Sequence, residues 1–167
     1  VSVHALDGTL VRSFGTQGSG DGEFGPELSF LAIGHDQVFV SDTGNNRVSV
    51  HSLDGTFLHS FGSEGSGDGQ FNYPTGVAVS EDEVFVAEEA NHRVSVHGLD
   101  GTFLRAFGTH GSGAGQFNAP RNVAVVGNSV IVTDSGNHRV SVHGLDGTFR
   151  RAFGSEGAGN GQFSNPW

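Results

Sequence analysis

The sequence contains no cysteine, no methionine and no lysine, so that all eight of its basic residues are arginine. Without cysteine the chain forms no disulfide framework, no thiolate metal site and no cysteine nucleophile. Eighteen acidic residues outweigh the arginines, and the formal net charge is −10. This balance argues against nucleic-acid binding, because Lys and Arg contacts to phosphates supply most of the non-specific affinity. No apolar run is long enough to span a membrane.

Glycine and phenylalanine are the residues that the sequence has in abundance. Glycine accounts for 28 of the 167 residues, but it follows no Gly-X-Y period, which excludes a collagen-like triple helix. The 14 phenylalanines argue against a disordered chain, because bulky aromatic side chains supply the burial that ordering requires. We therefore expect a folded protein that is glycine-rich and acidic.

A repeat of 46 or 47 residues runs through the whole sequence. The tetrapeptide Val-Ser-Val-His begins at Val1, Val48, Val94 and Val140. Each copy is followed by Asp-Gly, then by Phe-Gly, then by a Gly-x-Gly-x-Gly-x-Phe run and finally by a proline: Pro26, Pro74, Pro120 and Pro166. The first unit carries one extra residue, which lies around 27–30. Self-similarity at such a period is typical of propellers and other repeat architectures.

One repeat contains four short segments with the composition of β-strands, at 76–79, 84–87, 93–97 and 102–107. They are rich in β-branched and aromatic residues, and the Asp100-Gly101 pair between the last two is a hairpin-turn signal. A helix is excluded because apolar residues do not recur at helical spacing. Four strands per unit predict an all-β fold, a β-propeller with four-stranded antiparallel blades.

These units resemble the NHL repeat family of β-propellers. The resemblance is carried by Gly65-x-Gly-x-Gly69-Gln70-Phe71, Pro74-Thr75-Gly76-Val77-Ala78-Val79, Val84-Phe85-Val86 and Asn91-His92-Arg93-Val94, and the same signature returns over 111–140. The family's usual Asp-x-Gly-Asn stands at Asp42 and Asp134, whereas the middle copy reads Glu88-Glu89-Ala90-Asn91. The resemblance implies a ring of about six four-stranded blades, within the ~4–8 that propellers generally contain.

The repeat divides the chain into parts of one propeller domain. We expect 1–26 to form half a blade, its last two strands, followed by a link; 27–73 and 74–119 to form one blade each; and 120–167 to form a blade and a link. That gives 14 strands, or three and a half blades, as an open arc. Three hypotheses explain how the ring is completed: by the remaining blades of a longer chain, by a second copy of this chain, or by a different protein that caps the arc. We favour the first. Unpaired strands at both ends invite pairing.

Four of the nine histidines occupy one repeat position, at the end of the third strand: His4, His51, His97 and His143. Because both faces of a blade pack on neighbouring blades, we expect these histidines to be hydrogen-bonded structural residues. A ring of imidazoles that binds metal is the alternative. It is disfavoured because equivalent residues lie far apart unless they line the central channel, and first strands line it. We predict neither a metal site nor a cofactor.

The glycine-rich runs are expected to link successive blades. They lack the Lys-Ser/Thr and the helix of a phosphate-binding loop. The acids Asp21 and Asp68 are replaced by Ala114 and Asn160 in the other units, which argues against calcium. We expect the closing aromatics to be buried anchors: Phe24, Phe71, Phe117 and Phe163. An acid precedes each of three arginines by five residues and predicts an Arg–carboxylate clamp: Arg47 with Asp42, Arg93 with Glu88, and Arg139 with Asp134. A partner-binding ring of arginines is the alternative.

Positions that depart from the repeat, or that lie in its loops, are candidates for specific function. Acidic residues are concentrated on the second full blade, at Glu81-Asp82-Glu83 and at Glu88-Glu89, although most such runs are simply solvated. Residues beside the first strands also vary and are expected near the mouth of the channel. The candidate partner-binding surface consists of Tyr73, Thr75, Glu88, Glu89, His92, Arg121, Asn122 and His138.

The sequence contains no catalytic constellation, because every candidate set recurs within the repeat and chemistry needs one asymmetric site. The favoured function is therefore a non-catalytic scaffold for protein–protein interaction, or a structural subunit of a larger assembly. The NHL resemblance also implies two alternatives. One is a lyase-like enzyme with metal in the central channel, whose ligands we cannot match here. The other is RNA binding, which the net charge of −10 disfavours.

Overall fold

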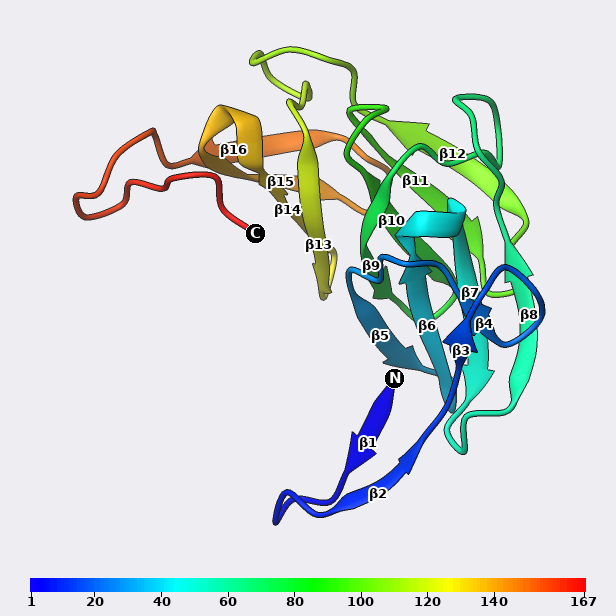
Figure 1. Ribbon diagram of the computed structural model, residues 1–167. Helices are drawn as coiled ribbons and strands as arrows, with labels where there is room; N and C mark the ends of the chain where they lie inside the picture. Colours follow the sequence, from blue (N-terminus) through cyan, green and yellow to red (C-terminus); the bar gives the residue numbers. More distant parts are fainter.

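The computed structural model describes residues 1–167 and contains three four-stranded antiparallel sheets arranged as the blades of an open propeller (Figure 1). The first blade comprises β5 (Leu31–Gly34), β6 (Gln37–Asp42), β7 (Arg47–Ser52) and β8 (Phe57–Phe61). The second comprises β9 (Pro74–Val79), β10 (Glu83–Glu88), β11 (Arg93–Gly98) and β12 (Phe103–Phe107). The third comprises β13 (Pro120–Val126), β14 (Ser129–Asp134), β15 (Arg139–Gly144) and β16 (Phe149–Phe153). The expected β-propeller blades are confirmed.

Half a blade precedes the three complete ones. It is a hairpin of β1 (Ser2–His4) and β2 (Leu10–Ser13), which correspond to the third and fourth strands of a blade. Two further strands, β3 (Thr16–Gln17) and β4 (Glu23–Phe24), pair in parallel within the first glycine-rich link and were not among the 14 expected strands. The later links contain only a single bridge at the same place, for example between His110 and Phe117.

The first strand of each blade lies on the inner side of the arc. Figure 1 shows β5, β9 and β13 along the concave side, β8 and β12 on the convex side, and both chain termini on the open side. The strand β5 begins five residues after Pro26, whereas β9 and β13 begin at their prolines. The extra residue of the first unit therefore lengthens the loop that precedes β5.

Short 3-10 helices connect the second and third strands in two blades: η1 (Thr43–Asn45) and η2 (Ser135–Asn137). The equivalent segment of the second blade, Glu89 to His92, forms a turn instead. None of the helices has the length and the apolar character that a membrane span requires.

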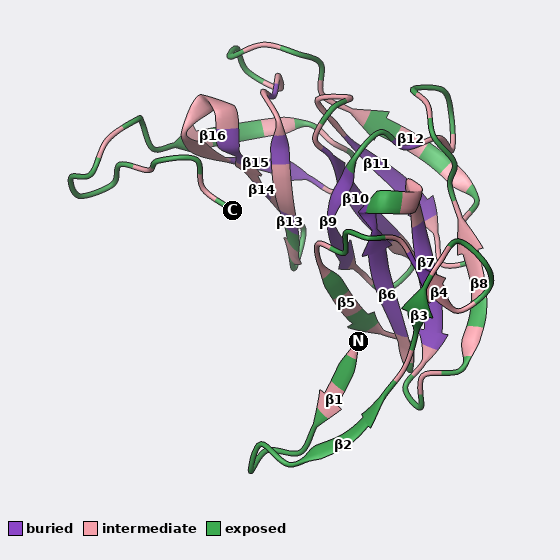
Figure 2. Ribbon diagram, in the orientation of Figure 1, coloured by how far each residue is buried: buried purple, intermediate pink, exposed green.

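The hydrophobic core lies between the blades rather than inside them. Nine buried residues fill the space between the second and third blades, among them Phe85, Val123 and Phe117, and seven fill the space between the first and second, among them Phe39 and Phe71. Figure 2 shows the buried residues concentrated in β6, β7, β10 and β11, with exposed residues towards both chain ends. Each sheet is thus stabilised chiefly by its neighbours, as in other repeat proteins.

The link phenylalanines anchor each blade to the next, with one exception. The side chains of Phe24, Phe71 and Phe117 are buried. Phe163 is only half-buried because no further blade packs against it, and it therefore departs from the expected buried anchor. The chain reverses beside each ring through a glycine such as Gly108, where φ is +98° and a Cβ would lie 2.3 Å from the Phe117 ring. Only glycine fits this position.

Candidate functional site

Two faces of the arc differ in the segments that they carry. We call the link face the one that bears the glycine-rich links and the loops between second and third strands, at 43–46, 89–92 and 135–138. We call the turn face the opposite one, which bears the tight turns at 35–36, 81–82 and 127–128 and the Asp-Gly hairpins. Nearly all of the candidate residues lie on the link face.

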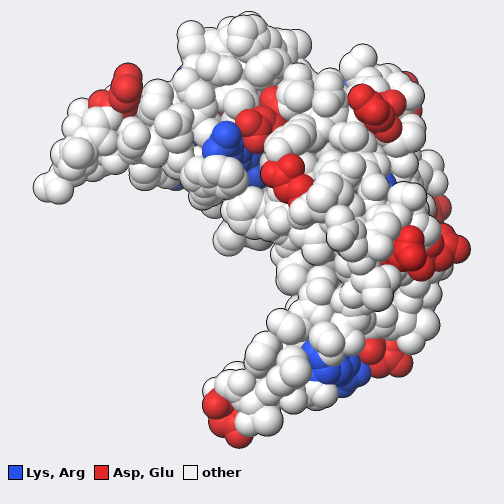
Figure 3. All heavy atoms as spheres, viewed as in Figure 1, with Lys and Arg blue, Asp and Glu red and all other residues white.

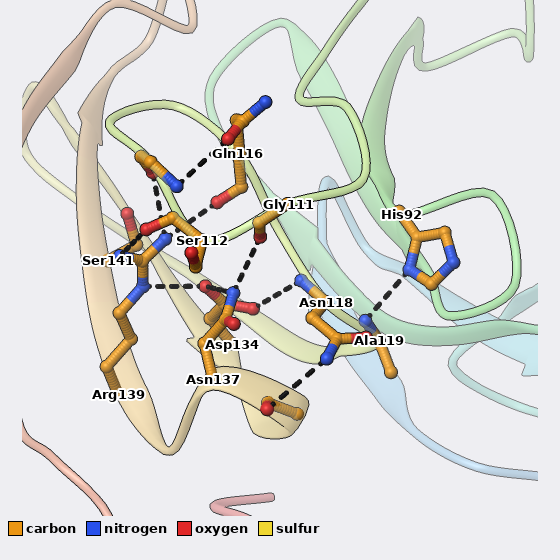
Figure 4. Close-up of polar contacts among 12 residues, drawn as sticks. His92, Gly111, Ser112, Gln116, Asn118, Ala119, Asp134, Asn137, Arg139 and Ser141 are labelled. Atoms are coloured by element: carbon orange, nitrogen blue, oxygen red, sulfur yellow. Dashed lines mark hydrogen bonds and ion pairs between the residues drawn. The ribbon is translucent and has the colours of Figure 1, made fainter.

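The expected arginine clamps are present and hold the links in place. Arg139 Nε lies 2.7 Å from Asp134 Oδ2, and the same pair forms at Arg47–Asp42 (2.9 Å) and Arg93–Glu88 (2.8 Å). The contact is not bidentate. The remaining guanidinium nitrogens of Arg139 donate instead to link carbonyls, those of Ser112, Gly113 and Gln116, at 2.7–3.0 Å (Figure 4).

Both oxygens of each buried carboxylate in these clamps accept hydrogen bonds. Asp134 also accepts hydrogen bonds from the Asn118 backbone N–H (2.7 Å) and from Asn137 Nδ2 (2.8 Å). The side chain of Glu88 is fully buried against Arg93 and Asn91. Glu88 therefore belongs to the scaffold, and its place in the candidate partner-binding surface was wrong. A carboxylate that solvent cannot reach is not a contact for a partner.

The repeated histidines are also part of the scaffold. His97 Nδ1 bonds with the Gly101 carbonyl (3.2 Å) and Nε2 with Ser95 Oγ (3.3 Å), and the ring packs 5.0 Å from that of Phe61. His51 and His143 have equivalent bonds. Burial is the main cause that lowers the pKa of all three below the ordinary value of 6.5. Both ring nitrogens are engaged within the protein, which leaves neither free to ligate a metal.

Several residues that depart from the repeat gather, together with the loop residue His92, around one cavity at the inner end of the link face. Its volume is about 420 Å³, and its wall includes five of the candidate residues: Tyr73, Thr75, Glu89, His92 and Arg121. Residues that were not candidates complete it, among them Glu27 and Trp167. All three complete blades contribute, since Glu27 precedes β5, Tyr73 precedes β9 and Arg121 lies in β13.

Charged and aromatic side chains are paired across this cavity. The Tyr73 hydroxyl donates to the carboxylate of Glu27, at 2.6 and 2.7 Å from its two oxygens, and this bond raises the pKa of Tyr73. Arg121 donates to Glu89 (3.1 Å), and its guanidinium carbon lies 3.9 Å from the centre of the Trp167 ring. Figure 3 shows basic and acidic groups side by side in this part of the concave side.

Glu89 explains why the second blade differs from its neighbours. In the first and third blades a hydroxyl stands at this position, and it donates to the next proline's carbonyl: Thr43 to Pro74 (2.7 Å) and Ser135 to Pro166. A glutamate cannot make this bond as a carboxylate, because it has no proton to donate. Its side chain pairs instead with Arg121 in the next blade.

The remaining candidates lie elsewhere. Asn122 accepts a hydrogen bond from the Val123 backbone N–H and lies outside the cavity. His138 accepts the Asn165 N–H (3.2 Å) at the last link. His92 makes the equivalent bond to the Ala119 N–H (3.0 Å), so that it is both a cavity residue and a structural one (Figure 4).

A signal for the two overlooked residues was present in the sequence. Glu27, Thr75, Arg121 and Trp167 each follow the closing proline of a repeat, and all four differ. A position that varies in every copy of an otherwise uniform repeat indicates residues with a role specific to one blade. Thr75 and Arg121 lie in the first strands β9 and β13, and Glu27 and Trp167 line the same cavity from outside the strands.

A second hollow of about 950 Å³ lies on the turn face between the second and third blades. It contains the acidic run of the second blade, but Glu83 is paired with Arg105 through two contacts of 2.6 and 2.8 Å. Arg105 also donates to the Leu145 carbonyl (2.6 Å), which ties the two blades together. Glu81 and Asp82 are exposed, as expected of a solvated run.

Comparison with known proteins identifies the repeat and the fold. The family model for the NHL repeat matches residues 71–96 and 117–142. No curated protein matches the sequence. Among solved structures, the chain is similar to hydrazine synthase of Kuenenia stuttgartiensis (13% identity, TM-score 0.60, 80% of this chain and 36% of that one). It is also similar to a streptogramin B lyase (15% identity, TM-score 0.64, 89% of this chain and 46% of that one). A third similar structure is glutaminyl cyclase of Myxococcus xanthus (13% identity, TM-score 0.56, 81% of this chain and 53% of that one).

These similarities bear on the fold and not on the activity. At 13–15% identity the shared feature is the β-propeller. The chain spans about a third to a half of the length of these structures, in keeping with an arc that contains part of a ring.

Proposed function

Because the chain is an NHL-repeat β-propeller protein, we propose that it is a non-catalytic binding platform whose partner docks at the link-face cavity. The observation that carries this proposal is the gathering of Tyr73, Glu89, His92 and Arg121 around one hollow. They come from three separate segments of the sequence; Tyr73, Glu89 and Arg121 depart from the repeat, and His92 lies in one of its loops. Their convergence on a rigid scaffold is what a recognition site requires.

The residues that recur in every repeat have a structural role, unlike the residues around the cavity. The buried histidines, the link phenylalanines and the clamp arginines have their polar atoms satisfied within the protein or their rings packed in the core. Such residues hold the blades together. The charged and aromatic cavity residues are partly exposed, and Trp167 and Tyr73 retain 65% and 39% of their accessible surface, whereas the candidate Thr75 is buried and donates to the Ala87 carbonyl. Exposed aromatic side chains are typical anchors of protein interfaces.

The chemistry of the cavity favours a polypeptide segment that carries a basic side chain. The cavity is lined by two carboxylates, of Glu27 and Glu89, and by one guanidinium, of Arg121, and the whole chain has a net charge of −10. Two aromatic rings provide surface for the stem of a Lys or Arg side chain or for a cation–π contact. Complementary charge also speeds the encounter with a basic partner.

A displayed library of random peptides, selected on the full chain, tests the proposal without knowledge of the natural partner. We expect enrichment of peptides with Lys or Arg. Calorimetry with a selected peptide should then show affinity reduced about tenfold or more by Glu89→Ser and by Tyr73→Ala. Both changes introduce the residue that another repeat has at that position, Ser135 or Ala119, so the fold is expected to tolerate them.

The matched control is Glu64→Gln, which removes an exposed carboxylate from a link where the first unit has Gln17. It should change the affinity by less than about twofold. Equal binding by wild type, Glu89→Ser and Tyr73→Ala would contradict the cavity as the docking site. Chemical conversion of a selected peptide by the chain would contradict the non-catalytic part of the proposal.

A further inference from the structure

Each complete blade is joined on the link face to the segment that follows it by the same kind of hydrogen bond. A side chain from the loop before the third strand accepts the backbone N–H of the residue that precedes the next proline. The acceptors are Asn46 for Tyr73 (2.9 Å), His92 for Ala119 (3.0 Å) and His138 for Asn165 (3.2 Å). Each of the three donor residues has a positive φ, of 58°, 51° and 46° respectively. The bond therefore fixes a backbone conformation that is unfavourable for a residue with a side chain.

The joint between the second and third blades differs from the other two. In the first and last joints a hydroxyl, of Thr43 or Ser135, also holds the next proline's carbonyl. The middle joint has Glu89 there and lacks this bond, so the His92–Ala119 bond alone links a side chain of the loop to the backbone in front of β13. The first joint uses Asn46, whose amide does not titrate, whereas the middle joint depends on an imidazole.

His92 has a second histidine next to it. The ring of His110, from the link after the second blade, lies 4.4 Å from that of His92, measured between centroids. The equivalent positions in the other links are Gln17, Glu64 and Glu156, so the pair is unique to this joint. Two imidazolium groups at this separation repel each other. Burial, and then His110, lower the pKa of His92 below its ordinary value of 6.5.

The other charged groups around His92 come from three elements. Glu89 lies in its own loop, Asp134 at the end of β14, and Arg121 in β13 on the same cavity. The charge of Asp134 is already compensated by Arg139. Glu89 is shared with Arg121, so a proton on His92 places a second cation beside this carboxylate.

The hydrogen bond to Ala119 requires that Nδ1 of His92 carry no proton. A protonated ring has donors at both nitrogens and cannot accept the Ala119 N–H. Ala119 is followed by Pro120 and Arg121, so the bond determines where Arg121 enters the cavity. Protonation of His92 breaks its bond to the Ala119 N–H and also makes His92 compete with Arg121 for Glu89. Both effects release Arg121.

We infer that the His92–Ala119 joint is a pH-sensitive switch, closed in neutral solution and opened by acidification, that controls the position of Arg121 in the link-face cavity. The inference rests on the proposed function in that this cavity is the docking site whose shape the switch changes. The equivalent joint of the first blade, between Asn46 and Tyr73, is insensitive to pH because its acceptor is an amide oxygen.

Nuclear magnetic resonance on the full chain, with labelled histidine, alanine and arginine, tests the switch without a partner. Signals of His92 Nδ1, the Ala119 amide and Arg121 Nε are followed from about pH 8 to about pH 5. We expect Nδ1 to be unprotonated at the start, and the Ala119 and Arg121 signals to shift with the His92 midpoint. In His92→Asn that shared transition should disappear. In His110→Gln the midpoint should rise, because the repulsion is removed.

His138→Asn is the matched control, since it makes the same substitution at the last joint and should leave the Ala119 transition unchanged. An Ala119 amide that shifts in His92→Asn as in wild type would overturn the inference, and so would a His92 Nδ1 that carries the proton at neutral pH. A joint that titrates as expected in a chain that binds no selected peptide at any pH contradicts the proposed function alone.

Discussion

The tetrapeptide Val-Ser-Val-His occupies two different environments in this molecule. In β11 it lies between two blades, and His97 is fully buried among phenylalanine rings. In β1 it lies in the half blade, and His4 is exposed. The local bonds are nearly the same, since His4 Nδ1 lies 3.1 Å from the Gly8 carbonyl and Nε2 lies 3.2 Å from Ser2 Oγ. The hairpin is therefore a property of the repeat, whereas its burial is a property of the neighbouring blades.

The largest expected effect distinguishes covered from uncovered copies of the link phenylalanine. Phe117→Ala removes a fully buried ring from the core between two blades and should destabilise the protein by about 3–5 kcal/mol. Phe163→Ala removes a half-exposed ring and should cost less than about 1.5 kcal/mol. Urea unfolding of the two variants measures the difference. Equal losses would show that the link face stabilises the end of the arc as strongly as its middle.

The second prediction concerns the buried carboxylate of a clamp. Asp134→Ala leaves Nε of Arg139 and the Asn118 N–H without their acceptor and should destabilise the protein by about 3 kcal/mol. Asp146→Ala alters an exposed hairpin turn and should have a much smaller effect. Thermal unfolding followed by circular dichroism compares the two. A larger loss at Asp146 would mean that the turns, and not the clamps, hold the blades.

The third prediction is that acid destabilises the complete blades. Burial lowers the pKa of His51, His97 and His143 below 6.5 in the folded protein. The unfolded chain therefore binds more protons between the folded pKa values and 6.5, and stability falls as the pH decreases through this window. The stability that these buried neutral histidines contribute is fully present above about pH 6.5. Urea midpoints at several pH values should show this slope, and His97→Gln should reduce it. A stability that rises on acidification would contradict the role of burial.

The smallest effect distinguishes the three hairpin turns of the complete blades. A hydrogen bond from Ser52 is the main cause that lowers the pKa of Asp54 to about 2, followed by the Thr56 N–H. Glycine stands at the position of Ser52 in the later turns, at Gly98 and Gly144. Ser52→Gly should therefore raise the pKa of Asp54, measured from its carboxyl carbon by nuclear magnetic resonance. The wild-type turn should keep this bond above about pH 3.8 and lose it as the pH falls towards 2. An unchanged titration in the variant would assign the shift to the backbone alone.

Several features of the site could be predicted from the sequence because they follow from the repeat. The Arg–carboxylate clamps were expected from a spacing of five residues, and they form between strand ends. Tyr73, Glu89 and Arg121 were recognised as departures from the repeat. Glu27 and Trp167 occupy the same variable position after the proline as Arg121, but neither lies in a first strand, where the candidates were sought. The burial of Glu88 was also missed, since the same residue type is exposed at Glu81.

The sequence by itself determined the four-stranded unit, its Asp-Gly hairpins and the order of its strands, because strand alternation and turn chemistry act between residues that are near in the chain. Only the tertiary structure decided which copies of a residue are buried and which side chains meet. Glu27 lies 46 residues from Tyr73, and Glu89 lies 32 from Arg121. Such pairs depend on how one blade is placed against the next. That placement results from the packing of phenylalanine and valine side chains between sheets, and no spacing within a single repeat encodes it.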